Sequence, residues 1–260
     1  MAGFANELKH RNPKVTEQSA VLYGAICKLQ EGSAAIRLLS QHGYVDELNV
    51  LLRTQVELSV NACYLQHASD EELMSYMYHD SIAGLVALQD MKKAHKNLLV
   101  PADLDSRVTK LANEASSASG LKVDSRTWDK KNLKKRADAI DEQTGLTDFA
   151  GLLATVYVTG SGYVHGSYKT IHKHVRYLIA GEEDYPWHVM FGANNVLHGV
   201  GHVQFIVARY LAKRFDFDTE RLNELAAEAV HVCDAMNADY RALKSAKGTT
   251  RRVMPERGDS

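Results

Sequence analysis

Apolar residues recur three or four positions apart along almost the whole chain, which is the spacing of one face of an α-helix. Alternating apolar runs joined by hairpin turns, the pattern of β-strands, are absent. Prolines stand only at positions 13, 101, 186 and 255, so long stretches contain no residue that ends a helix. The pattern predicts an all-α protein, a single antiparallel helical bundle of about eight or nine helices.

Glycine, proline and capping residues set the boundaries that we expect for these helices. Gly43 ends the first helix, and Ser69 gives the N-terminal capping signal of the third. We expect residues 16–245 to form one helical domain, residues 1–15 a polar tail, and residues 246–260 a disordered tail. The expected helices run over about 16–41, 44–67, 70–99, 103–119, 128–143, 168–180, 187–215 and 219–244.

Composition agrees with a globular protein and gives no sign of a strongly basic surface. The chain has 260 residues, of which 45% are hydrophobic and 24% are charged, and its formal net charge is -1. No overall positive field is therefore present to attract nucleic acid non-specifically. The charged stretch 128–143 interleaves lysine and arginine with acids, and we expect it to form a solvated helical face.

Cysteine usage and the N-terminal segment predict a cytoplasmic protein. Cys27, Cys63 and Cys233 are far apart and lie in apolar helical segments, so we interpret them as small buried hydrophobic residues. That usage suits a reducing compartment. The N-terminal segment lacks the apolar core of a signal peptide, and no run of about 18 apolar residues occurs, so no membrane span is predicted.

A polar line runs along the apolar helix expected over 44–67. Asn49, Arg53, Glu57 and Asn61 follow one another at intervals of four and fall on one face. Three interpretations stay open: an exposed ion pair between Arg53 and Glu57, a buried structural network, or a functional site. In a site, Arg53 would recognise phosphate or carboxylate, and Glu57 would orient it, act as a base or bind a metal. Asn49 is a further candidate for ligand binding.

A second polar motif, Ser161-x3-His165, follows an apolar stretch and would place both residues on one helical face. Three glycines surround the two residues, at positions 160, 162 and 166, and they allow close approach of a backbone or a ligand. His165 is either a hydrogen-bonded core residue or a general acid or base near neutral pH. Ser161 lacks the G-x-S-x-G context of a nucleophile. Tyr157 and Tyr168 flank the motif and are candidates for ligand contact through their hydroxyls or rings.

His198 and His202 are also four residues apart, a spacing at which two imidazoles on a helix bind one metal ion. The metalloprotease motif H-E-x-x-H is absent, and a third ligand would come from Glu57 or His165. The alternative is that these histidines pack, form hydrogen bonds or assist at the same polar centre, which Asn195 would join. We therefore expect no cofactor, and a divalent metal is the one that the sequence leaves open.

Three segments resemble the helical bacterial proteins grouped as domain of unknown function 5677. They are LLRTQVELSVNACYL, the stretch around Trp128, and VYVTGSGYVHGSY, and the resemblance covers roughly residues 35–180. Members of that family resemble this chain in having an R-x3-E motif on an early helix, followed by a tyrosine-rich S-x3-H-G/P-S segment. The resemblance implies that the positions of interest are Arg53, Glu57, Ser161 and His165, and it implies no defined activity.

The chain is more loosely similar to HEPN-type helical ribonucleases, which occur in toxin–antitoxin and antiphage systems. Those proteins pair an arginine and a histidine on one helix as R-x4-6-H, usually at a dimer interface. Here Gly160 stands five residues before His165 and Ala193 five residues before His198, so the pattern is not met. Arg53, from another helix, would have to supply the cation.

Three hypotheses follow for the function. The first is a helical ligand-binding or regulatory module with a place in bacterial defence or toxin–antitoxin systems. The second is a HEPN-like, metal-independent ribonuclease that uses Arg53 and His165. The third is a metal-dependent helical-bundle enzyme that uses His198 and His202. The expected partners are a second copy of the chain and RNA or a small phosphorylated ligand, and no membrane.

Overall fold

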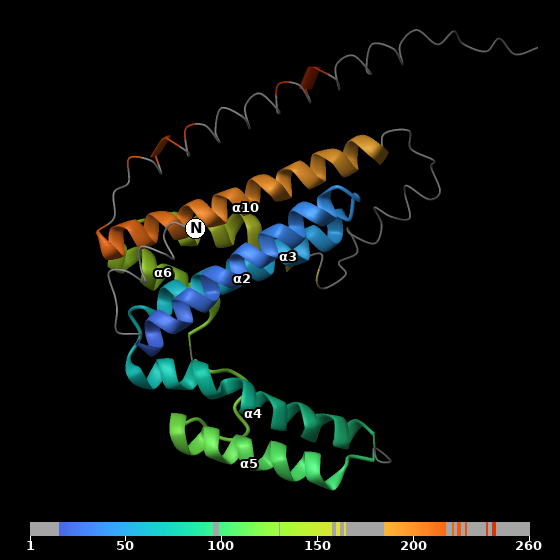
Figure 1. The fold of residues 1–260 in the computed structure, drawn as a ribbon, viewed down its shortest axis with the longest axis vertical. Helices are drawn as coiled ribbons and strands as arrows, with labels where there is room; N and C mark the ends of the chain where they lie inside the picture. Colours follow the sequence, from blue (N-terminus) through green and yellow to red (C-terminus); the bar gives the residue numbers. More distant parts are fainter. Residues whose placement is uncertain are drawn as a thin grey trace, which may run out of the picture. The chain divides into compact units, whose positions relative to one another are not determined.

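The computed structural model describes residues 16–95, 99–129, 131–157 and 185–216, together with positions 160, 161, 164, 220, 223, 224, 227, 238, 241 and 242. The elements in these ranges are helical, and no strand occurs among them, which confirms the all-α prediction. They are α2 (Glu17–Ser40), α3 (Val45–Leu65), α4 (Asp70–Ala94), α5 (Ala102–Ser119), α6 (Leu133–Thr144), α7 (Asp148–Leu152), the π-helix η1 (Leu153–Tyr157) and α10 (Tyr185–Phe215) (Figure 1).

Local signals in the sequence explain most of the helix boundaries. Gly43 follows α2 with a φ of 76°, a left-handed conformation that glycine adopts without strain. Ser69 caps α4: its hydroxyl accepts a hydrogen bond from the Glu72 backbone N–H, and the Glu72 carboxylate accepts one from the Ser69 N–H. α4 ends at Ala94 rather than near 99, since His95 leaves the helical conformation.

The helix expected over 128–143 begins later than predicted. Asn132 accepts a hydrogen bond from the Lys135 N–H through its side chain, and it caps a helix whose first residue is Leu133. Trp128, Asp129 and Lys131 therefore lie in non-helical chain before α6. The prediction of a helix start at Trp128 is wrong because the capping asparagine, and not the aromatic residue, determines the first turn.

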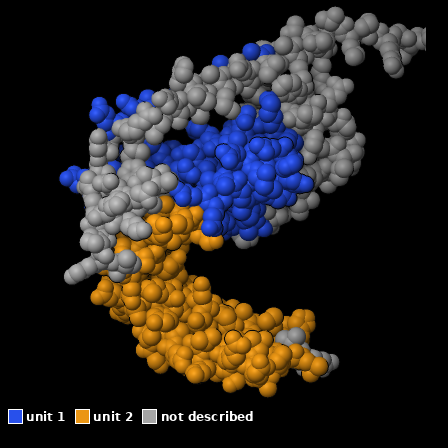
Figure 2. Space-filling view, in the orientation of Figure 1, with its two compact units in different colours: residues 1–4, 29–56, 154–260 blue, residues 5–28, 57–153 orange. Residues whose placement is uncertain are grey.

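The chain divides into two compact units (Figure 2), and the expectation of one helical domain over residues 16–245 stays a prediction. Unit 1 comprises residues 1–4, 29–56 and 154–260, and unit 2 comprises residues 5–28 and 57–153.

Unit 1 is built around α10 and the parts of α2 and α3 that belong to it. Glycines on α10 allow close contact with α3, because a Cβ atom at Gly192 would stand 2.6 Å from Val45, and one at Gly199 would stand 2.6 Å from Leu52. The core consists of Leu29, Ile36, Val45, Leu48, Leu52, Val56, Ala193, Val196, Val200, Val203, Ile206, Val207, Tyr210 and Leu211.

Unit 2 contains the α4–α5 hairpin, in which the two helices pack side by side (Figure 1), and the α6–α7 pair. The carboxylate of Asp141 accepts hydrogen bonds from the backbone N–H groups of Phe149 and Ala150, at 3.1 and 2.8 Å, and so ties α6 to the first turn of α7. Cys63 is buried as expected, and burial raises the pKa of its thiol. Cys27 is half-buried.

Several predicted features lie outside the described residues. They are the tails over 1–15 and 246–260, the helix expected over 168–180, and Cys233. The described positions between 220 and 242 are helical, in agreement with the helix expected over 219–244. Among the helices that the structure describes, none has the length and apolar character needed to cross a membrane.

Candidate functional site

Arg53 and Tyr157 form the centre of the polar region in unit 1. Nη2 of Arg53 donates a hydrogen bond of 3.0 Å to the Tyr157 hydroxyl, and the guanidinium carbon lies 4.7 Å from the centre of the tyrosine ring. Both side chains are half-buried. Tyr157 is the last residue of η1, and π-helical turns recur at functional sites. One tyrosine therefore contacts the guanidinium through both its hydroxyl and its ring.

Gly160 brings the start of the second motif against α3. A Cβ atom at this position would stand 2.7 Å from the Arg53 Cβ and 3.0 Å from the Asn49 backbone oxygen, so the close approach requires glycine. Ser161 follows directly, in a helical conformation and half-buried. The two polar motifs, about a hundred residues apart, thus meet at Arg53 and Gly160, although His165 itself lies outside the described residues.

The other predicted ligand-binding residues differ in their placement. The side-chain amide of Asn49 donates a hydrogen bond of 2.8 Å to the Val45 carbonyl, one turn earlier on the same helix. Asn195 is exposed on α10, and Tyr168 lies outside the described residues. Of these candidates, Tyr157 is in contact with Arg53.

In unit 2, the polar line of α3 continues as Glu57 and Asn61 and meets a cation from α6. Nη1 of Arg136 donates a hydrogen bond to the Asn61 side-chain oxygen. Burial lowers the pKa of the Arg136 guanidinium, while the charges of Asp129 and Glu57 act to raise it. Sequence reasoning missed Arg136, because a contact with another helix leaves no mark in the spacing along α3.

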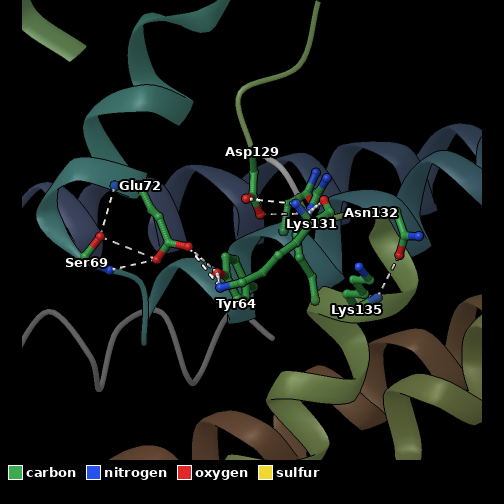
Figure 3. A network of polar contacts seen from close by, with 9 residues as sticks. Tyr64, Ser69, Glu72, Asp129, Lys131, Asn132 and Lys135 are labelled. Atoms are coloured by element: carbon green, nitrogen blue, oxygen red, sulfur yellow. Dashed lines mark hydrogen bonds and ion pairs between the residues drawn. The ribbon is translucent and has the colours of Figure 1, made fainter. Parts of the chain in front are cut away.

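A second polar network joins α3, α4 and the chain before α6 (Figure 3). The Tyr64 hydroxyl donates a hydrogen bond of 2.6 Å to Oε1 of Glu72, and the Lys131 ammonium donates to both groups, at 3.0 Å to Glu72. Burial raises the pKa of Glu72, but the hydrogen bonds from Tyr64, Lys131 and the Ser69 backbone outweigh it and leave the pKa lowered. Hydrogen bonds with Tyr64 and Glu72 raise the pKa of Lys131.

Beside this network, Arg136 lies between an acid and an aromatic ring. Its Nε is 3.6 Å from a carboxylate oxygen of Asp129, with only 12% and 7% of the two side chains exposed. Its guanidinium carbon is 4.4 Å from the centre of the Trp128 ring, which Tyr76 contacts edge-on at 5.2 Å.

The prediction that 128–143 forms a solvated face is therefore wrong for Arg136 and Asp129. It holds for Lys134 and Asp138, whose ion pair of 2.8 Å leaves 76% and 45% of the side chains exposed. The regular spacing of charges along the segment does not distinguish the two kinds of pair. Two signals in the segment indicated burial: the tryptophan beside the first acid, and the helical spacing that places Arg136 on the same face of α6 as the buried Ala137 and Ile140.

His198 and His202 both lie exposed on α10. Their ring centres are 6.5 Å apart and the ring planes differ by 22°. Within the described part of the chain, no three histidine, cysteine or acidic residues come together in an arrangement that could hold a metal ion. The predicted metal-dependent active site with Glu57 or His165 as third ligand stays a prediction.

Comparison with known proteins identifies a family for this chain. Neither the curated proteins nor the solved structures include a significant match to this chain. A family model matches residues 19–183, well over half of the chain and a range that contains both polar motifs. The chain therefore belongs to the family of unknown function DUF5677.

Proposed function

We propose that the protein is a helical ligand-binding module that takes an anionic group, a phosphate or a carboxylate, at Arg53. The observation that carries the proposal is the double contact of the guanidinium with Tyr157, through a hydrogen bond of 3.0 Å and through the ring face at 4.7 Å. Such contacts fix the plane of the guanidinium, and a fixed planar fork of N–H donors suits bidentate recognition of phosphate and carboxylate.

The packing around Gly160 supports the same proposal. Because Gly160 lies against Arg53, the residue that follows it, Ser161, enters the same part of unit 1 with a hydroxyl that can donate to an anion. His165, four residues after Ser161, would add a titratable donor. Arg53 is half-buried, so an ion bound there would be shielded in part from solvent, which strengthens its interaction with the cation.

Binding of inorganic pyrophosphate to wild type and variants tests the proposal. Arg53→Lys keeps the charge and loses the fork, and Tyr157→Phe keeps the ring and loses the hydroxyl. We expect each to weaken binding by about tenfold, since a hydrogen bond to a charged group contributes about 1.5–3 kcal/mol. Arg37→Ala, which removes an exposed arginine of α2, is the matched control and should leave affinity unchanged. Equal affinity in all four proteins would refute the proposal.

A second candidate is a metal-independent ribonuclease that uses Arg53 and His165. Gly160 stands five residues before His165, where the HEPN pattern has its arginine, and the contact between Gly160 and Arg53 favours this candidate because it brings an arginine to that position from another helix. Arg53 would stabilise the phosphate charge and His165 would act as acid or base. Cleavage of a labelled RNA in the presence of a chelator should then fall in both His165→Ala and Arg53→Ala. Unchanged cleavage in both variants would remove this candidate.

The place in bacterial defence rests on the looser similarity to HEPN-type proteins, whereas the cytoplasmic location rests on cysteine usage and the N-terminal segment. Both, and the homodimer, stay predictions. Size measurement in solution and phage challenge of cells that express the protein would test them.

A further inference from the structure

We propose that His198 and His202 form a surface site on α10 for one divalent transition-metal ion of the zinc, nickel and copper class. This site is independent of the anion site at Arg53 and differs from the three-ligand active site that the sequence leaves open. It uses two imidazoles from one helix, and its remaining coordination positions are filled from solvent.

The helix fixes the separation of the two side chains. α10 runs without interruption from Tyr185 to Phe215, so His198 and His202 stand one turn apart on one face. Four residues of α-helix span about 6 Å along the axis, and the ring centres are 6.5 Å apart with planes only 22° from parallel. An ion about 2.0–2.1 Å from each donor needs the two nitrogens within about 4.2 Å of each other, so both side chains must turn toward each other to bind it. Exposed side chains on one face of a helix are free to make that rotation.

The opposite face of α10 shows why the helix keeps its place when a metal binds. Val196, Val200 and Val203 are buried, and they point away from the two histidines on the helical wheel. His198 and His202 are both exposed. The site therefore lies on a helix held by its core contacts, and metal binding needs no rearrangement of the backbone.

The chemistry of the donors determines the class of ion. Neutral imidazole suits zinc, copper and nickel, whereas magnesium and calcium prefer oxygen ligands. The nearest cationic side chain further along the helix is that of Arg209, seven residues or about 10 Å beyond His202 and placed over the Phe205 ring at 6.0 Å. At physiological salt a charge at that distance is largely screened, so it does not oppose the ion.

A calorimetric titration of the full chain with nickel chloride tests the site. We expect one site in wild type, and a loss of affinity of about tenfold or more in His198→Ala and in His202→Ala, because the second imidazole binds at high effective concentration only when the first is present. His95→Ala removes an exposed histidine outside α10 and is the matched control. Copper added to the same proteins should give an electron paramagnetic resonance spectrum with two nitrogen ligands in wild type and one in each variant.

Thermal unfolding provides the folding check and a second readout. The substitutions replace exposed side chains, so all proteins should unfold at similar temperatures without metal. Nickel should raise the unfolding temperature of wild type and of His95→Ala, and not that of the α10 variants, because a ligand that binds only the folded chain stabilises it. Equal nickel affinity in wild type and in both α10 variants would overturn the proposal, as would a loss in His95→Ala equal to theirs.

Discussion

Gly160 lies so close to Arg53 that a Cβ atom at position 160 would stand 2.7 Å from the Cβ of the arginine, with the Asn49 backbone oxygen only slightly farther away. Neither of these atoms is the flexible end of a side chain, so the contact has no easy way to relax. The packing of the second polar motif on α3 therefore depends on the absence of a side chain at this one position.

Gly160→Ala should destabilise the protein by about 1–3 kcal/mol, the usual result of forcing an extra carbon into a packed contact. It should also weaken pyrophosphate binding, because Arg53 would have to move. Urea unfolding followed by circular dichroism measures the first effect. Gly84→Ala is the control, since Gly84 lies within α4 with open space around it and alanine there should stabilise the helix by up to about 1 kcal/mol. Equal effects of the two substitutions would show that the contact at Gly160 does not constrain the fold.

Glu72→Gln should reduce stability at neutral pH by about 1 kcal/mol or less, because Lys131 and Glu72 are both partly exposed and solvent screens their attraction. Glutamine at this position still caps the Ser69 N–H, so the substitution isolates the charge that faces Lys131 and Tyr64. The difference in free energy of unfolding between the two proteins, measured in urea, gives the effect.

The same pair of proteins tests the lowered pKa of Glu72. Because the folded state holds this pKa below the ordinary value of 4.5, the stabilisation is complete above that pH and is lost as the pH falls through the folded value. The stability curves of wild type and Glu72→Gln should therefore converge in acid and run parallel above pH 5 or so. If the difference in free energy of unfolding between the two proteins stays constant into acid, the charge of the Glu72 carboxylate is not the source of the stabilisation.

Arg136→Met should be the most damaging of these changes. It leaves the 7%-exposed carboxylate of Asp129 without its guanidinium neighbour, and breaking a buried ion pair on one side costs about 3–5 kcal/mol. The double variant Arg136→Met/Asp129→Asn should recover part of the loss. Lys134→Ala, which breaks an exposed ion pair on the same helix, should change stability by less than about 0.5 kcal/mol. Chemical unfolding of the four proteins measures these differences, and a double variant no more stable than the single one would contradict the ion pair's role.

The sequence predicted the helices closely where a local residue sets the boundary. Gly43 and the Ser69 cap gave the ends of α2 and the start of α4 almost to the residue, because a left-handed glycine and a capping box act within one turn. The division into two units was not predicted, since the helical period reports which face is buried and not what covers it.

The candidate site was predicted in part for the same physical reason. The intervals of four along α3 marked Arg53 as a side chain that needs a polar neighbour. Tyr157, which contacts it, was a candidate because it flanks the second polar motif. Asn61, on the part of α3 that belongs to unit 2, contacts Arg136 of α6. This contact, and the burial of Asp129, arise from packing between segments far apart in the chain. No periodicity within one segment carries that information.

The most direct test of the central claim is the affinity of pyrophosphate for Arg53→Ala, measured by calorimetry beside wild type and Arg37→Ala. An anion site at Arg53 predicts saturable binding in wild type and in Arg37→Ala, and a fall of about tenfold or more in Arg53→Ala while its circular dichroism spectrum stays that of the folded protein. Binding to Arg53→Ala as tight as to wild type would contradict the claim.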